Sequence, residues 1–264
     1  MPHRQRLCRL ALALACVLAL AACGTTGPGG LRIDRSIQAK SQNSRVEFVV
    51  LHYTAADNPR SLLILSKGNV SSHYLLTRDL PPQIFELVDE SRRAWHAGAS
   101  SWYGYTGINA ASIGIEIVNA GKGDQGWNPY TPEQTAALTA LLHDIVQRHQ
   151  IKPMNIVGHS DIAPQRKLDP GPLFPWKQLA QAGLGRWYDE TLAATYADGF
   201  MRDGLPGAAW FQQELKRVGY ETPSTGVLDK ATRNVLAAFQ MHYRPSRHDG
   251  QPDFETAGIL KALR

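Results

Sequence analysis

Cysteine is almost absent from this sequence, and the positions of the few cysteines exclude two kinds of stabilising centre. The 264 residues include three cysteines, and all of them lie within the first 23 positions: Cys8, Cys16 and Cys23. The rest of the chain can therefore form neither an internal disulfide nor a thiolate zinc site. Any metal bound by the body of the protein must be held by His, Asp or Glu side chains.

An excess of one charge is also missing once the N-terminus is set aside. The formal net charge is +5, but Arg4, Arg6 and Arg9 belong to the first 22 residues, which contain no acidic residue. The remaining chain carries 25 basic against 23 acidic residues and no basic run. Nucleic acid is therefore not an expected partner, whereas a weakly positive surface suits an acidic polymer.

No apolar run is long enough to span a bilayer as a stable helix, because the stretch from about Leu10 to Ala22 is too short. Preceded by three arginines, this stretch is typical of an export signal over residues 1–22. Leu20, Ala21 and Ala22 before Cys23 resemble the bacterial lipoprotein cleavage box, in which the cysteine thiol receives a diacylglycerol. The alternative is an ordinary signal that is cleaved after small residues.

The segment that follows Cys23 favours lipidation, because residues 23–40 are rich in Gly and Thr near their start, as a tether would be. Gly24 rather than Asp follows the cysteine. By resemblance to enterobacterial sorting rules, this residue favours the outer membrane. We therefore expect a lipid-anchored protein that faces the periplasm.

Hydrophobic patterning beyond residue 40 predicts strands interleaved with helices. The predicted strands are 46–51, 74–77, 84–88, 112–118 and 155–158, and the predicted helix is 132–150. This order indicates an α/β fold, with a mixed central β-sheet flanked by helices, over residues 41–182. Short helices predicted over 215–220, 230–242 and 256–263 indicate a separate small C-terminal three-helix domain over residues 191–264.

Three side chains suited to metal binding lie at or after the ends of predicted strands. His52 ends the first strand, His159 ends a later one, and Asp169 follows ten residues on. Open sheets build active sites just past such strand ends. Two imidazoles and one carboxylate form the three-ligand set of a catalytic zinc. Taken singly, each residue is more often structural, so the spacing alone does not establish the site.

Two further residues suggest catalytic chemistry. Glu116 interrupts an apolar strand between Ile115 and Ile117. A carboxylate on an apolar face is costly unless it meets a cation or several donors, so it suits a general base beside the metal. The alternative is a strand-edge Glu that faces solvent. Lys167, two residues before Asp169, is either a surface lysine or a group that stabilises an oxyanion.

Five short segments carry a family resemblance. They are 50–54 (VLHYT), 71–74 (SSHY), 94–98 (AWHAG), 112–116 (SIGIE) and 158–172 (GHSDIAPQRKLDPGP). In this order, over about residues 40–180, they resemble the zinc N-acetylmuramoyl-L-alanine amidases of the type-2 amidase family. Within that family the likeness is to the lipoprotein branch of the Gram-negative outer membrane rather than to the cytosolic recycling branch.

The resemblance implies one zinc ion per chain, with His52, His159 and Asp169 as ligands, and it implies Glu116 and Lys167 as catalytic residues. His96 corresponds to a wall of the substrate cleft. In phage-lysozyme-like relatives a tyrosine precedes the histidine of the Ser-His-Tyr segment. Here that position is Ser72, so Glu116 must take its part of the chemistry.

The implied reaction is hydrolysis of the amide between N-acetylmuramic acid, intact or 1,6-anhydro, and the L-alanine of the peptidoglycan stem peptide. It would serve cell-wall degradation or recycling. The implied partners are peptidoglycan and muropeptides, with a membrane contact through the N-terminal lipid. We expect a monomer.

The C-terminal segment resembles the three-helix peptidoglycan-binding domain. The residues that carry this resemblance include Leu215, Gly219, Tyr220, Gly226, Asp229, Thr232, Val235, Phe239, Gln240 and Thr256. The family's Asp-Gly-x-Gly is here Asp249-Gly250-Gln251-Pro252, a departure that concerns ligand binding more than the fold.

Two rival functions remain open at this point. Relatives of this fold in animal immunity bind peptidoglycan without cutting it and have lost zinc ligands, whereas the ligand set here is complete. A zinc peptidase that cuts within the stem peptide would use similar ligands, so the sequence excludes it only weakly.

Overall fold

The computed structural model describes residues 30–31 and 33–263, and the chain divides into two units, residues 1–43 and 44–264. The predicted export signal, the acceptor Cys23 and the first part of the predicted tether lie outside the described residues. Across the part of the chain that is described, no helix is both long and apolar enough to cross a membrane.

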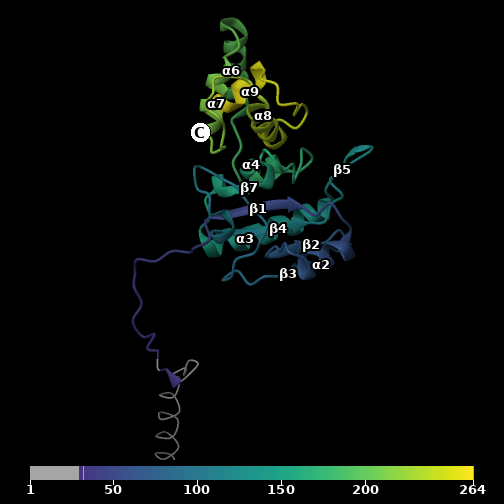
Figure 1. Cartoon of the computed structure of the whole chain (residues 1–264), viewed down its shortest axis with the longest axis vertical. Helices are drawn as coiled ribbons and strands as arrows, with labels where there is room; N and C mark the ends of the chain where they lie inside the picture. Colours follow the sequence, from purple (N-terminus) through teal and green to yellow (C-terminus); the bar gives the residue numbers. More distant parts are fainter. Residues whose placement is uncertain (1–29, 32, 264) are drawn as a thin grey trace, which may run out of the picture. The chain divides into compact units, whose positions relative to one another are not determined.

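A five-stranded mixed sheet forms the centre of the second unit (Figure 1). Its spatial order is β3-β2-β4-β1-β7. The strands are β1 (Phe48–Tyr53), β2 (Tyr74–Leu76), β3 (Ile84–Glu86), β4 (Ser112–Ile117) and β7 (Ile156–Gly158). Strand β3 pairs antiparallel with β2, and the other neighbours are parallel. The prediction of a mixed sheet is confirmed.

Helices and a small hairpin surround this sheet. The elements are α2 (Asn58–Lys67), hairpin strands β5 (Lys122–Gly123) and β6 (Gly126–Trp127), α3 (Pro132–His149), the single turn α4 (His159–Ile162) and α5 (Trp176–Gln181). Helix α3 was predicted, and it begins with a reciprocal capping box between Thr131 and Gln134. Helices α2, α4 and α5 were not predicted, because each presents too few turns for a clear hydrophobic period.

Strand alternation gives the two faces of the sheet different partners. Odd-numbered residues of β1 and β4, such as Leu51 and Ile115, pack against Leu138 and Leu142 of α3. Even-numbered residues such as Val50 belong to a second cluster on the opposite face. His52 and Glu116 have even parity and stand at the carboxyl ends of their strands, so α3 does not cover them.

Four helices follow the sheet domain: α6 (Glu190–Asp203), α7 (Ala208–Arg217), α8 (Lys230–Tyr243) and α9 (Phe254–Ala262). Helices α7 to α9 are the predicted three, although the first was wrongly placed at 215–220 and in fact ends at Arg217. Helix α6 was missed because Gly199 weakens its helical pattern. It is held by close packing on α9, where a Cβ at Gly258 would lie 2.4 Å from the carbonyl oxygen of Ala193.

The helical domain packs directly against the sheet domain. Tyr220 meets Trp102 edge to face, with ring centroids 5.0 Å apart, and the two belong to one continuous hydrophobic cluster. The backbone N–H of Tyr103 donates to the carbonyl oxygen of Gly219 at 2.9 Å. Helix α8 contacts both α4 and α5. The two domains therefore share a core.

Candidate metal and catalytic centre

Parallel pairing brings the candidate residues to one edge of the sheet. In the register of β1 and β4, His52 lies opposite Glu116. Strand β7 pairs with β1 up to Gly158, so His159 emerges immediately beyond the same edge. Because parallel strands end at a common edge, residues that are far apart in the sequence meet there.

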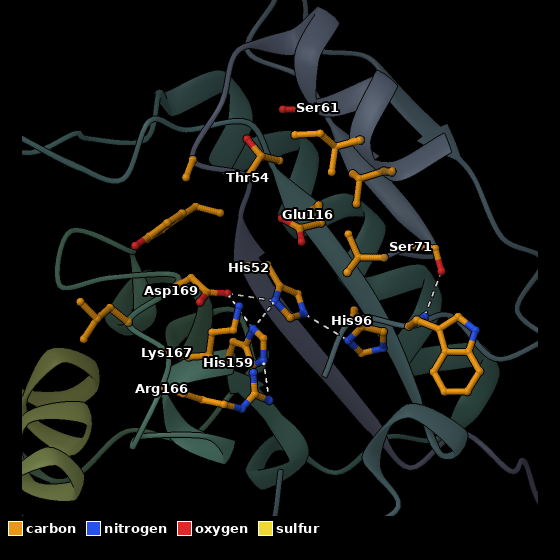
Figure 2. A pocket seen from close by; sticks show the side chains of 17 residues that line it. His52, Thr54, Ser61, Ser71, His96, Glu116, His159, Arg166, Lys167 and Asp169 are labelled. Atoms are coloured by element: carbon orange, nitrogen blue, oxygen red, sulfur yellow. Dashed lines mark hydrogen bonds and ion pairs between the residues drawn. The ribbon is translucent and has the colours of Figure 1, made fainter. Parts of the chain in front are cut away.

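The three predicted ligands converge, as Figure 2 shows. The Nδ1 atoms of His52 and His159 lie 2.9 Å apart, and each lies 3.0 Å from Oδ2 of Asp169. The three residues are buried, with exposed fractions of 1%, 3% and 7%. These are the three residues that the family resemblance assigned to one zinc ion.

Hydrogen bonds on the far side of the His159 ring fix which nitrogen faces the centre. Its Nε2 lies 3.1 Å from the carbonyl oxygen of Ala97. A carbonyl only accepts, so Nε2 carries the proton and donates to it; the contact between Nε2 and Nη2 of Arg166, which would need the opposite role, is longer at 3.4 Å. In this tautomer Nδ1 of His159 carries no proton, and it lies 3.0 Å from Oδ2 of Asp169.

A longer chain of hydrogen bonds fixes His52 in the same way. The Ser112 hydroxyl donates to the carbonyl oxygen of Ile108 at 2.6 Å, so its oxygen accepts from Nε2–H of His96 at 3.1 Å. Nδ1 of His96 must then accept from Nε2–H of His52, also at 3.1 Å. This order leaves Nδ1 of His52 without a proton.

Burial keeps the imidazole rings of His52 and His96 neutral. Burial, followed by the neighbouring His159, lowers the pKa of His52 to about 4. Burial and the same kind of neighbour, His52, lower the pKa of His96 well below its ordinary value. Near neutral pH both rings therefore have one lone pair to offer, as the hydrogen-bond order requires.

This donor set fits a zinc ion. Two unprotonated nitrogens and a carboxylate oxygen, buried within 3.0 Å of one another, repel unless a cation lies among them. Ligand distances of 2.0–2.1 Å in a tetrahedral site give donor separations of about 3.3 Å, close to those observed. Nitrogen and oxygen ligands of this kind suit zinc.

Glu116 lies beside this centre and faces a cavity of about 390 Å³. Its Oε2 is buried and has no hydrogen-bond partner within the described residues. Burial, and then the charge of Asp169, raise the pKa of Glu116 well above its ordinary value, and Lys167 opposes this shift. Lys167 lines the same cavity. A carboxylate in this setting can accept a proton from a bound water.

His96 also lines this cavity, at 8% exposure, but it has a contact that the sequence analysis did not predict. It lies between His52 and Ser112, and by accepting a hydrogen bond from Nε2–H of His52 it fixes the tautomer of that candidate ligand. Gly114 makes room for it, because a Cβ there would lie 2.4 Å from the ring. The predicted cleft position and this positioning contact are compatible.

Two other residues clarify the surroundings. The Ser72 hydroxyl donates to the carbonyl oxygen of Gly114 at 2.7 Å and does not line the cavity. Arg166, which the sequence analysis did not single out, donates to the carbonyl oxygens of Ala97 and Ala99. It thereby holds the loop over residues 97–99, whose Ala97 carbonyl accepts the hydrogen bond from His159. Its place one residue before Lys167 was the available signal.

Taken together, a buried His-His-Asp set that could hold a metal ion and a neighbouring carboxylate oxygen without a partner among the described residues are the features of a hydrolase site. Residues 42–172 match the family model described as N-acetylmuramoyl-L-alanine amidase, and residues 206–260 match that of a peptidoglycan binding domain. The chain is 42% identical over 263 residues to the N-acetylmuramoyl-L-alanine amidase AmiD of Escherichia coli K12, covering 95% of each protein. The chain belongs to the N-acetylmuramoyl-L-alanine amidase family and has the amidase activity of that family.

Solved structures agree with this assignment. AmpDh3 from Pseudomonas aeruginosa, in complex with an anhydromuramic pentapeptide, superposes with a TM-score of 0.82 at 44% identity, covering 88% of this chain and 97% of that one. Escherichia coli AmiD, in complex with anhydro-N-acetylmuramic acid-L-Ala-D-γ-Glu-L-Lys, gives a TM-score of 0.79 at 41% identity, covering 91% and 96%. The predicted fold class is confirmed.

The hydrogen-bond chain predicts the effect of replacing His96. His96→Phe removes the acceptor for Nε2–H of His52, so His52 no longer has a preferred tautomer. We expect the affinity for Zn²⁺ to fall about 10-fold, as for other residues that orient metal ligands. His96→Gln retains an oxygen acceptor and should keep most of the affinity. Competition with a chromogenic chelator measures both, and equal affinity in wild type and His96→Phe would contradict the assigned order.

Proposed function

We propose that the enzyme binds one zinc ion through His52, His159 and Asp169 and uses it to hydrolyse the amide between N-acetylmuramic acid and L-alanine. The observation that carries this proposal is the convergence of two histidine Nδ1 atoms and one carboxylate oxygen, each within 3.0 Å of the others. A cysteine-free body offers no competing thiolate set.

We propose muramyl peptides, including the 1,6-anhydro form, as substrates. The two solved relatives hold anhydromuramyl peptides, and this chain covers nearly all of each. Its cavity is lined by Glu116 and Lys167, and also by Trp95, whose side chain is 53% exposed. A mixture of apolar and charged lining suits a sugar that carries an amide-linked peptide.

The proposed division of labour follows from the contacts. When bound, zinc would polarise the lactyl carbonyl and lower the pKa of the attacking water toward ~7. Oε2 of Glu116, which has no partner among the described residues, takes one proton from that water. The water oxygen bonds to the carbonyl carbon. The carbon–nitrogen bond then breaks, and Glu116 passes its proton to the departing alanine nitrogen.

Lys167 is proposed to stabilise the negative charge that develops on the carbonyl oxygen. Its ammonium faces the cavity near Glu116, and its charge acts on that carboxylate and on His52. A fixed cation at this place stabilises the transition state more than the neutral substrate.

Two rival functions are less well supported. A recognition protein that binds peptidoglycan without cutting it has no use for Glu116 with an unpartnered oxygen, whereas hydrolysis needs that oxygen. A peptidase acting within the stem peptide would use a similar centre. Mass spectrometry of the products separates the two enzymes, because only the amidase releases a stem peptide that starts at L-alanine.

Replacing Glu116 tests the proposed base. Glu116→Gln keeps the size of the side chain but cannot accept the proton, so kcat should fall about 10²–10⁴-fold. Zinc content, measured by elemental analysis, should stay at one ion per chain because Glu116 is not a ligand. A Glu116→Gln enzyme that releases L-alanine-initiated peptides from an anhydromuramyl tripeptide at the wild-type rate would exclude this role.

We propose further that the chain is exported and anchored as a monomer to the outer membrane, on its periplasmic side, by a lipid on Cys23. The proposal is supported by the arginines and apolar run before Cys23 and by the tether that follows it. An amidase anchored on this side of the outer membrane would meet peptidoglycan in the periplasm.

Replacing the acceptor cysteine tests the anchor. Cys23→Ser should move the protein from the membrane pellet to the soluble fraction of disrupted cells, because the thioether can no longer form. Cys16→Ser, within the predicted signal, is the matched control and should remain in the pellet. Detection of the Cys23→Ser protein in the membrane fraction at the wild-type level would refute lipidation at this residue.

A further inference from the structure

A fully buried carboxylate lies two residues beyond the candidate ligand His159. Asp161 is 1% exposed and accepts three hydrogen bonds. Its Oδ2 accepts from the backbone N–H of Gly158 at 2.7 Å and from Nδ1–H of His242 at 2.8 Å. Its Oδ1 accepts from the hydroxyl of Tyr220 at 2.6 Å. The proposed chemistry of the cavity does not use this carboxylate.

Two of these three donors belong to the C-terminal helical domain. Tyr220 follows α7 and is 1% exposed, and His242 belongs to α8 and is 4% exposed. The His242 ring stacks on Trp176 with centroids 3.8 Å apart and on Tyr243 at 4.1 Å. Packing therefore fixes both donors. Without them, Asp161 would be a buried carboxyl group with a single hydrogen bond, which is a costly state.

The turn that Asp161 caps carries the candidate ligand His159 and is hydrogen-bonded to the backbone of a second candidate ligand, Asp169. The bond of Asp161 to Gly158 N–H closes the first turn of α4, which begins at His159. The next residue, Ser160, donates its backbone N–H to the carbonyl oxygen of Asp169 at 2.8 Å. Helix α8 contacts α4 (Figure 1). Asp161 thus connects Tyr220 and His242 of the helical domain to the turn that begins at His159.

We propose that Asp161, Tyr220 and His242 are positioning residues through which the helical domain sets the placement of His159 and Asp169. The domain that matches a peptidoglycan-binding family would then act in the metal centre itself, besides any contact with the cell wall. This inference rests on the proposed zinc ligands. It predicts that the domain is needed even for soluble substrates that are too small to need wall binding.

Two variants remove one donor each and keep an aromatic ring. Tyr220→Phe deletes a hydroxyl, and His242→Phe deletes the Nδ1–H while retaining a ring against Trp176. In the full-length enzyme we expect the Kd for Zn²⁺ to rise about 10-fold in each variant, because the ligands are less well oriented. For a soluble anhydromuramyl tripeptide, kcat should fall while KM stays near the wild-type value.

Two matched controls separate positioning from general stability. His242→Asn places an amide N–H near the position of Nδ1–H and should restore most of the zinc affinity. Gln240→Leu, on the same helix, removes buried bonds to Gln251 and Thr256 but none to Asp161. It should lower Tm and leave the Kd for Zn²⁺ unchanged.

The result that would overturn the inference is a folded Tyr220→Phe or His242→Phe protein with wild-type zinc affinity and wild-type kcat on the soluble tripeptide, and with weaker activity only on intact sacculi. The domain would then act only in wall binding. Tyr220→Phe removes a single hydroxyl, so it keeps the test decisive if His242→Phe does not fold. A wild-type enzyme that binds no zinc would instead contradict the proposed function.

Discussion

Two paths of hydrogen bonds that end at backbone carbonyls decide which nitrogen of each candidate histidine ligand faces the centre. His159 donates to the carbonyl of Ala97. His52 donates to His96, which donates to the Ser112 hydroxyl, and that hydroxyl donates to the carbonyl of Ile108. Since carbonyl oxygens cannot donate, every proton in these paths points away from the centre. In this order Nδ1 of His52 and Nδ1 of His159 carry no proton and lie beside the carboxylate of Asp169. Each N–H and O–H donor in these two paths has a hydrogen-bond acceptor.

The rest of the architecture serves this arrangement. Parallel pairing of β1 with β4 and β7 sets His52, Glu116 and the start of α4 at one edge. Strand parity directs His52 and Glu116 to the face that α3 leaves uncovered. On that same face the helical domain completes a shared core and supplies two donors to Asp161. The domain boundary in the sequence is therefore not a boundary in the packing around the metal ligands.

Much of the fold and of the candidate site could be predicted from the sequence because the signals are local. The apolar stretches around His52 and Glu116 predicted the central strands, and hydrophobic patterning over residues 132–150 predicted α3. The contacts that could not be predicted are long-range. Asp161 is 59 residues from Tyr220 and 81 residues from His242, and no local pattern pairs them. Similarly, His96 could be assigned to the cleft, but its proton order depends on Ser112 and Ile108, which only the folded chain brings near it.

We infer that the order of these hydrogen bonds presents Nδ1 of His52 and Nδ1 of His159 to the metal ion. A high-resolution crystal structure of the zinc-loaded enzyme, with anomalous scattering recorded at the zinc edge, tests it most directly. We expect one zinc ion bonded to Nδ1 of His52, Nδ1 of His159 and a carboxylate oxygen of Asp169, with Nε2 of His52 still directed at His96. Coordination through Nε2 of either histidine, or an anomalous peak away from these three residues, would contradict it.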